Sequence, residues 1–182
     1  MTMDDKSLVE LISKELRELM NTDFPIATGE DYEIDRETDT YAFIARNMYW
    51  LRKLGVRILL EHEVKDITPD SPRDGFVDII FTRNSTILVA VEIKNWRGND
   101  KVKNLLDDFK KCRLLHQIYT DKCFIIDNTH KCERSNEQFL REHGLIEEAD
   151  LVKKGSIEIL GHEMGEYWTD DFKKYHKSFK KK

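Results

Sequence analysis

The most apolar part of the chain is GFVDIIFTRNSTILVAVEIKNW, residues 75–96. Its two halves are rich in β-branched residues and are separated by a short polar stretch, which is the pattern of a β-hairpin. Because 36% of all residues are charged, a run this apolar must lie in the core of any fold that the chain adopts. Yet Asp78 lies within the first strand, and Glu92 and Lys94 lie within the second. The fold must either expose these three charges or hold them for a purpose.

The length of the hairpin loop decides whether the three charges lie together. Side chains alternate between the two faces of a strand, and directly opposed residues share a face. With a three-residue loop, Arg83–Ser85, Asp78 is opposite Ala90 and all three charges share a face. With a two-residue turn, Asp78 would be opposite Val91 and this agreement would be lost. We therefore predict the three-residue loop.

Helix-like and strand-like patterns alternate along the rest of the chain, without an internal repeat or a flexible linker. This order predicts one α/β domain, in which a mixed β-sheet is flanked by helices. Residues 39–127 form its core and 128–182 a C-terminal extension. The expected elements are a helix at 4–20, an acidic loop at 21–38, a helix at about 39–54 closed by Gly55, a strand at 56–64, hairpin strands at about 76–82 and 86–94, a helix from about 99, a strand at 122–127, a helix at about 133–143 and a strand at 156–160.

Composition and charge restrict the setting. No apolar run approaches the roughly 20 residues of a membrane-spanning helix, and the first residues lack the pattern of a signal peptide. The three cysteines form no disulfide framework, so we expect a reducing, cytoplasmic setting. A net charge of −5 argues mildly against an extended nucleic-acid surface. The six lysines among the last ten residues either bind a phosphate backbone or are simply solvated.

Carboxylates beside a lysine at the end of a hairpin suit phosphodiester chemistry. Mg²⁺ (or Mn²⁺) prefers oxygen ligands and retains several waters, and a bound metal lowers the pKa of an attacking water. A neighbouring lysine can orient that water and stabilise developing negative charge. In the strand at 56–64, Glu61 and Glu63 share a face, and either is a candidate for a further carboxylate of the cluster.

The spacing of the charged residues resembles a known signature. Asp78, thirteen intervening residues and then Glu92-Ile93-Lys94 at the end of an apolar strand resemble the PD-(D/E)xK nuclease superfamily. Its restriction-endonuclease-like core is a helix, three strands, a helix and a strand, which corresponds here to residues 39–127. The resemblance implies a Mg²⁺-dependent nuclease that hydrolyses phosphodiester bonds, with DNA as the expected substrate.

The resemblance also implies residue roles. Asp78 and Glu92 match the two acidic metal ligands, Lys94 matches the catalytic lysine, and the backbone carbonyl of Ile93 is a further candidate ligand. Val77 stands where the signature has proline. Many members dimerise in order to cut two strands, so a homodimer is expected by resemblance alone.

Many members of the superfamily add a glutamate from the first helix or the first strand. The expected helix has no acid within 41–54, so Glu63, as a catalytic residue, or Glu61, as a metal ligand, would fill that place.

Residues that follow the second hairpin strand are candidate contacts to nucleic acid. Trp96 is placed to stack on a base and Arg97 to bind a phosphate, while Lys101 and Lys103 would contact the backbone. Packing of Trp96 against the sheet and solvation of the lysines are the structural alternatives. Two wider alternatives stay open: a nuclease-like module that binds nucleic acid or a protein partner without catalysis, and an edge hairpin whose charges form only surface ion pairs.

Overall fold

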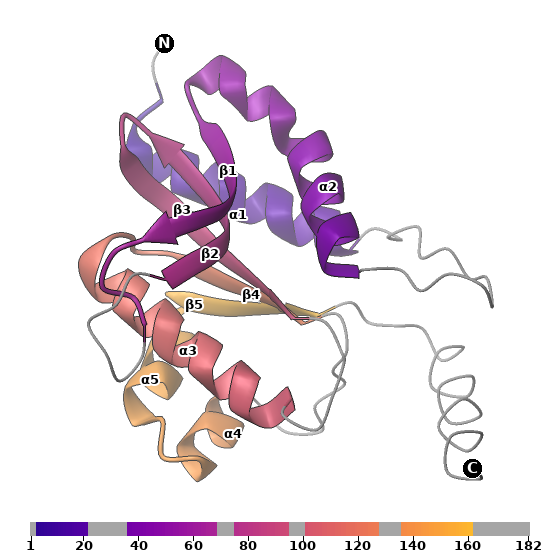
Figure 1. Cartoon of the computed structure of the whole chain (residues 1–182). Coiled ribbons are helices and arrows are strands. Elements are labelled where there is room, and N and C mark those ends of the chain that lie inside the picture. The colour runs from indigo at the N-terminus through magenta and orange to yellow at the C-terminus, as the bar shows by residue number, and fades with distance from the viewer. Residues whose placement is uncertain (1–2, 22–35, 69–74, 95–100, 128–135, 162–182) are drawn as a thin grey trace, which may run out of the picture.

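The computed structural model describes residues 3–21, 36–68, 75–94, 101–127 and 136–161. They form an α/β structure around a five-stranded mixed sheet, so the predicted α/β class with a mixed sheet flanked by helices is confirmed (Figure 1). The strands lie in the sheet in their sequence order. The first strand is antiparallel to the second and the second to the third, whereas the third, fourth and fifth strands are parallel to one another. They are β1 Arg57–Val64, β2 Gly75–Arg83, β3 Thr86–Lys94, β4 Cys123–Asp127 and β5 Ile157–Gly161.

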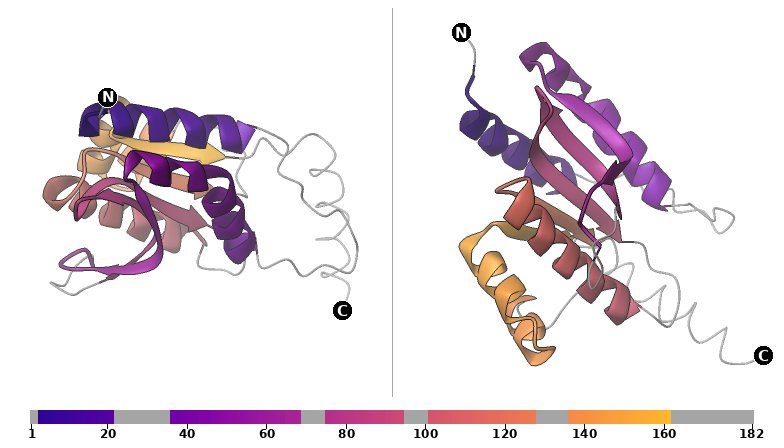
Figure 2. Two further views of the ribbon diagram at one scale, coloured as in Figure 1. Left: turned by 90° about the horizontal axis from the view of Figure 1, so that it is seen from above. Right: turned by 60° about the vertical axis from the view of Figure 1, so that its left-hand side comes forward.

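Helices cover both faces of this sheet. They are α1 Asp5–Asn21, α2 Arg36–Met48, the 3-10 helix η1 Tyr49–Leu54, α3 Lys101–Ile118, α4 Asn136–Glu142 and α5 Ile146–Lys154. The first three lie on one face and the last three on the other, which gives three layers (Figures 1 and 2). No helix among the described residues is both long and apolar enough to cross a bilayer.

The sheet separates two apolar clusters. Leu8, Ile12 and Leu16 of α1 are fully buried in the cluster on the first face. Phe109 and Leu115 of α3 are buried in the cluster on the second face. β3 and β4 supply residues to both clusters, as expected of central strands. The carboxyl ends of β3 and β4 therefore lie at one edge between two helical layers, where α/β proteins commonly bind ligands.

The hairpin between β2 and β3 differs from the prediction. Its turn consists of two residues, Asn84 and Ser85, whose φ angles are 50° and 67°. Arg83 is opposite Thr86, so the predicted three-residue loop is wrong. A β-bulge then shifts the register by one residue, with Leu88 as the extra residue. Beyond the bulge, even-numbered residues are opposite even-numbered ones, as Ile80 and Ala90 are. The paired register ends at Ile79, before it reaches Asp78, so the bulge does not bring Asp78 and Glu92 onto one face.

Two helical segments also differ from the prediction. The helix expected at 39–54 already begins at Arg36, and it gives way after Met48 to η1. Gly55 ends η1 with a φ of 78°, as expected of a glycine after a helix. The polar stretch that follows Gly144 forms α5, which sequence reading missed because the segment is short and rich in charge.

Candidate functional site

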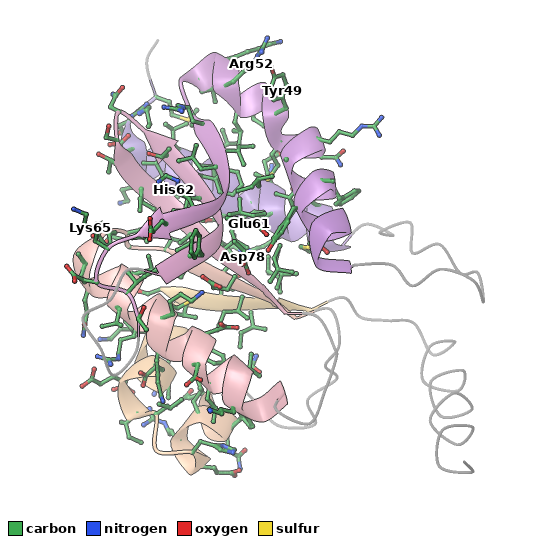
Figure 3. The ribbon with its side chains drawn as sticks, viewed as in Figure 1. Tyr49, Arg52, Glu61, His62, Lys65 and Asp78 are labelled. Atoms are coloured by element: carbon green, nitrogen blue, oxygen red, sulfur yellow. The ribbon has the colours of Figure 1, made fainter. Side chains whose placement is uncertain are left out.

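β1 and β2 both change their side-chain alternation at the same level. Glu61 has a positive φ of 45° and lies opposite Asp78, between two regular pairs. On β2, Ile79 packs in the first cluster, whereas Val77 packs in the second. Residues two apart on a regular strand share a face, so β2 turns at Asp78. In Figure 3 Glu61 and Asp78 lie on the side of the strands that faces α2, and His62 lies on the other side.

The carboxylate of Asp78 is held by two donors. The Tyr41 hydroxyl of α2 donates a hydrogen bond to Oδ1 over 3.2 Å, and the backbone N–H of Ile93 donates one to Oδ2 over 2.6 Å. The second bond is charge-assisted and ties the first half of β2 to the end of β3. Because Asp78 is only half-buried, its carboxylate is fixed in position and still borders on solvent.

The carboxylate of Glu92 forms a buried ion pair. Its Oε2 accepts a hydrogen bond from Lys111 Nζ over 2.6 Å, and the same ammonium donates to the backbone carbonyl of Phe76 over 2.9 Å. The Glu92 side chain is 1% exposed and that of Lys111 is 19% exposed. A carboxylate this deeply buried needs a partner charge to remain ionised, and α3 provides it.

The carboxylates of the two predicted acids are held from opposite sides of the sheet. Asp78 is bound to the N–H of Ile93, the residue that follows Glu92. Asp78 contacts α2, whereas Glu92 contacts α3. Among the described residues no group of three or more His, Cys, Asp and Glu side chains is arranged to hold a metal ion. The hairpin therefore holds the Asp78 carboxylate at the Ile93 peptide and the Glu92 carboxylate at α3, and the described residues do not join them into a larger acidic cluster.

The other predicted site residues, Lys94, Glu61 and Glu63, are located by their positions on the strands. Lys94 is the last residue of β3, in register with Asp127 at the end of β4, so a further acid ends the neighbouring strand. Glu63 is exposed on β1 opposite Phe76, whereas Glu61 lies opposite Asp78.

Of the four predicted nucleic-acid contacts, only the two lysines belong to the part of the chain that the structure describes. Trp96 and Arg97 lie outside the described residues. Lys101 begins α3, and Lys103 is exposed on its first turns.

The basic residues in the middle of α3 are engaged within the protein. Lys110 pairs with Asp107 over 3.3 Å. Arg113 reaches α5, where its Nε pairs with Glu148 over 2.8 Å and its Nη1 with Glu147 over 3.1 Å. A helix whose lysines and arginines are neutralised in this way presents less positive charge to a polyanion than its sequence indicates.

Two buried thiols lie beside the Glu92 ion pair. A hydrogen bond with Cys123, together with burial and the nearby charge of Glu92, raises the pKa of the Cys112 thiol well above its usual range. Cys123 also contacts the backbone carbonyl of Cys112 over 3.6 Å. Because a thiol with a raised pKa is a poor nucleophile, Cys112 is part of the core and not of a reactive centre. Cys123 is likewise fully buried in the core.

Sequence reasoning missed Tyr41 and Lys111 as partners of the site. Tyr41 lies at an apolar position of its helix pattern, and Lys111 belongs to a helix rich in lysine, so neither pattern indicates a contact with an acid. One signal was available for Lys111, because it directly precedes Cys112 and lies four residues before Leu115, both fully buried. A lysine at that position borders on the apolar stripe of α3.

No protein-family model matches the chain, and a search of curated proteins also found no match. The function of this chain must therefore be inferred from its own residues.

Proposed function

We propose that this protein is a Mg²⁺-dependent nuclease that hydrolyses phosphodiester bonds in DNA. The observation that carries the proposal is the buried carboxylate of Glu92 at the end of β3, one residue from the N–H group that binds Asp78. Burying a charge is costly, and a buried ion pair adds little to stability. A pair of this kind at a strand end is therefore better explained by a site than by the needs of the core.

The order of the elements supports the proposal. From α2 to β4 the chain runs helix, three antiparallel strands, helix and a strand parallel to the third. This is the order that the resemblance to the restriction-endonuclease-like core implies. Asp78 falls on the second of these strands and Glu92-Ile93-Lys94 on the end of the third, as that signature requires.

The oxygen donors at this site suit a hard divalent cation. Mg²⁺ is usually held by one or two carboxylates together with water and substrate phosphate. Asp78 and Glu92 supply that number, and the carbonyl of Ile93 is a neutral oxygen of the same strand end. A tetrahedral zinc site would need more nitrogen or sulfur ligands. When bound, Mg²⁺ supplies a Lewis acid that lowers the pKa of a water and offsets charge on the phosphate.

The residues of the chain then have separate tasks. Asp78 and Glu92 are the carboxylates that would hold the cation, and Lys94 would orient the attacking water and stabilise the negative charge that develops on phosphorus-bound oxygens. Glu61, opposite Asp78 on β1, is a better candidate than Glu63 for a further carboxylate. In this proposal Trp96 and Arg97 contact the DNA, and a second copy of the chain allows both strands to be cut.

A module of the same fold that binds nucleic acid or a protein partner without cleavage is the second candidate. One observation favours it: Glu92 is already neutralised by Lys111. In that case the acid would serve only to attach α3 to the sheet. Such a module has no need of a carboxylate-dependent metal site, so calorimetric titration with Mn²⁺ separates the two candidates.

Cleavage of a mixed set of DNA substrates in the presence of Mg²⁺ tests the proposed function. We expect Asp78→Ala and Lys94→Ala each to lower the cleavage rate by at least about 100-fold, because each removes a group that acts on the reacting phosphate. Removal of the metal with a chelator should abolish cleavage of every substrate.

Matched controls exclude an effect of charge alone. Asp121→Ala and Lys153→Ala change exposed residues away from the site and should cleave at the wild-type rate. Undiminished, chelator-resistant cleavage by both site variants would reject the assignment.

A further inference from the structure

A single ammonium group joins two strands at the candidate site. Lys111 Nζ binds Glu92 Oε2 at the end of β3 and the carbonyl oxygen of Phe76, two residues before Asp78 on β2. A carboxylate and a carbonyl from neighbouring strands are thus bound to one cation that α3 supplies. Carboxylate and backbone carbonyl oxygens are also the ligands that hard divalent cations prefer.

The exposures of the two charged side chains show which one lies nearer to solvent. The Glu92 side chain is 1% exposed, whereas that of Lys111 is 19% exposed. The carboxylate is thus almost fully enclosed, and its partner is the more exposed of the two. Because Lys111 Nζ binds both Glu92 Oε2 and the Phe76 carbonyl oxygen, a cation that binds these two oxygens together has to take the position that the ammonium holds.

We propose that Lys111 is an internal counter-ion, which holds the cation position between Glu92 and the Phe76 carbonyl in the metal-free protein and is displaced when a divalent cation binds. The inference rests on the proposed nuclease function and adds the Phe76 carbonyl to its oxygen donors. Lys111 has a flexible four-carbon stem and a compact charge, so its head group can leave while the backbone of α3 stays in place.

Once a divalent cation has displaced it from Glu92, the Lys111 ammonium is available for a second interaction. Its ammonium remains on α3 beside the site, where it can bind a phosphate oxygen of the nucleic acid. The same residue thus keeps Glu92 paired in the absence of metal and adds positive charge near the substrate in its presence. Lys111 is a positioning residue in the first state and a substrate contact in the second.

Calorimetric titration of the full chain with Mn²⁺ tests the proposal. Lys111→Met keeps the length of the side chain but removes the competing charge, so we expect Mn²⁺ to bind at least about tenfold more tightly than to wild type. Lys111→Arg keeps the charge and should bind no more tightly than wild type. All titrations are made at one pH, since proton release alters metal affinity. An unchanged or weaker affinity of Lys111→Met would overturn the proposal.

Lys110→Met is the matched control. Lys110 is the adjacent lysine of α3 and pairs with Asp107 at the surface, so its loss should leave the Mn²⁺ affinity unchanged.

A labelling measurement on the wild-type protein does not depend on whether a variant folds. Acetylation by acetic anhydride, followed by mass spectrometry, should modify Lys111 several-fold faster with Mg²⁺ than without, while Lys110 reacts equally in both. Equal labelling of Lys111 in both conditions would contradict displacement.

The Mn²⁺ affinities of wild type, Glu92→Gln and Lys111→Met separate the counter-ion role of Lys111 from the proposed metal site. If wild type binds Mn²⁺ and Glu92→Gln does not, the metal site stands, and an affinity of Lys111→Met equal to that of wild type refutes the counter-ion role alone. If neither wild type nor any variant binds Mn²⁺, both proposals fall together.

Discussion

Two buried carboxylates among the described residues pair with charges on other elements. Glu92 on β3 meets Lys111 on α3, and Glu148 on α5 meets Arg113 on α3. Removing one member of such a pair leaves the other charge buried without a partner, which costs far more than the pair contributes. The first pair therefore attaches α3 to the sheet and the second attaches α5 to α3, and together they allow a chain with 36% charged residues to place some of them inside.

Glu158 supplies a part of the stability that depends on pH. A hydrogen bond from Arg17 on α1 and then one from Lys122 lower the pKa of this carboxyl to about 2, from an ordinary value of 4.5. Because its pKa is lower in the folded state, the ionised carboxylate stabilises the fold above about pH 4.5, and this contribution is lost as the pH falls toward 2.

We expect Glu158→Gln to lower the free energy of unfolding by about 1–2 kcal/mol at neutral pH, because solvent screening of a partly exposed group retains only part of the full shift. Near pH 2 the variant and wild type should be equally stable. Urea unfolding at both pH values measures the difference. Glu147→Gln is the control, since its side chain is 70% exposed and should matter little. A constant difference at both pH values would show that packing, and not charge, is responsible.

The acids of the candidate site could be predicted from the sequence, but their partners could not. Asp78 and Glu92 interrupt apolar strands, and this is visible in the residue pattern alone. Lys111 lies in an amphipathic helix, where a lysine is ordinarily solvated. Its burial depends on a glutamate 19 residues away on another element, and no local pattern records that contact. Tyr41 was missed for the same reason, since its hydroxyl meets a residue 37 positions away.

At the scale of elements, the apolar runs predict where the strands begin and end, but they do not predict how neighbouring strands pair. β2 and β3 lie where the sequence predicts them, because few other structures accommodate such runs. The offset between them depends on the bulge at Leu88, which arises from the pairing of two strands and has no signature in either strand. A similar limit applies at Glu61, whose positive φ reverses the alternation that had placed it with Glu63.

The turn of the β2–β3 hairpin carries strain that can be relieved. Ser85 has a φ of 67°, in the left-handed region that favours glycine. Two-residue turns with positive φ at both positions are most stable as Asn-Gly. We therefore expect Ser85→Gly to raise the free energy of unfolding by about 0.5–1 kcal/mol, measured as a shift of the urea midpoint.

Thr86→Gly is the control for this prediction. Residue 86 begins β3, where glycine lowers stability because it is flexible and has no side chain to pack. The same change at adjacent positions should therefore have opposite signs. A destabilised Ser85→Gly variant would show that Ser85 does not adopt the left-handed conformation.

At the scale of the molecule, a single sheet serves two apolar clusters. Val91 and Phe124 face the cluster that α1 completes, while Ala90 and Cys123 face the cluster that α3 completes. The candidate site lies at the strand ends between these layers, with Asp78 bound from α2 and Glu92 from α3. Its geometry therefore depends on both helical layers being packed.

This arrangement predicts that the two faces unfold together. Ile12 and Leu115 are fully buried in opposite clusters, and both clusters share β3 and β4. We expect Ile12→Ala and Leu115→Ala each to lower the free energy of unfolding by about 2–5 kcal/mol, in a single transition. Native-state hydrogen exchange should become faster in both α1 and α3 whichever residue is changed. Lys14→Ala, at an exposed position of α1, is the control and should alter neither helix. Faster exchange confined to α1 in Ile12→Ala, with α3 as protected as in wild type, would mean that the layers unfold separately and that the candidate site can be lost without the loss of the whole fold.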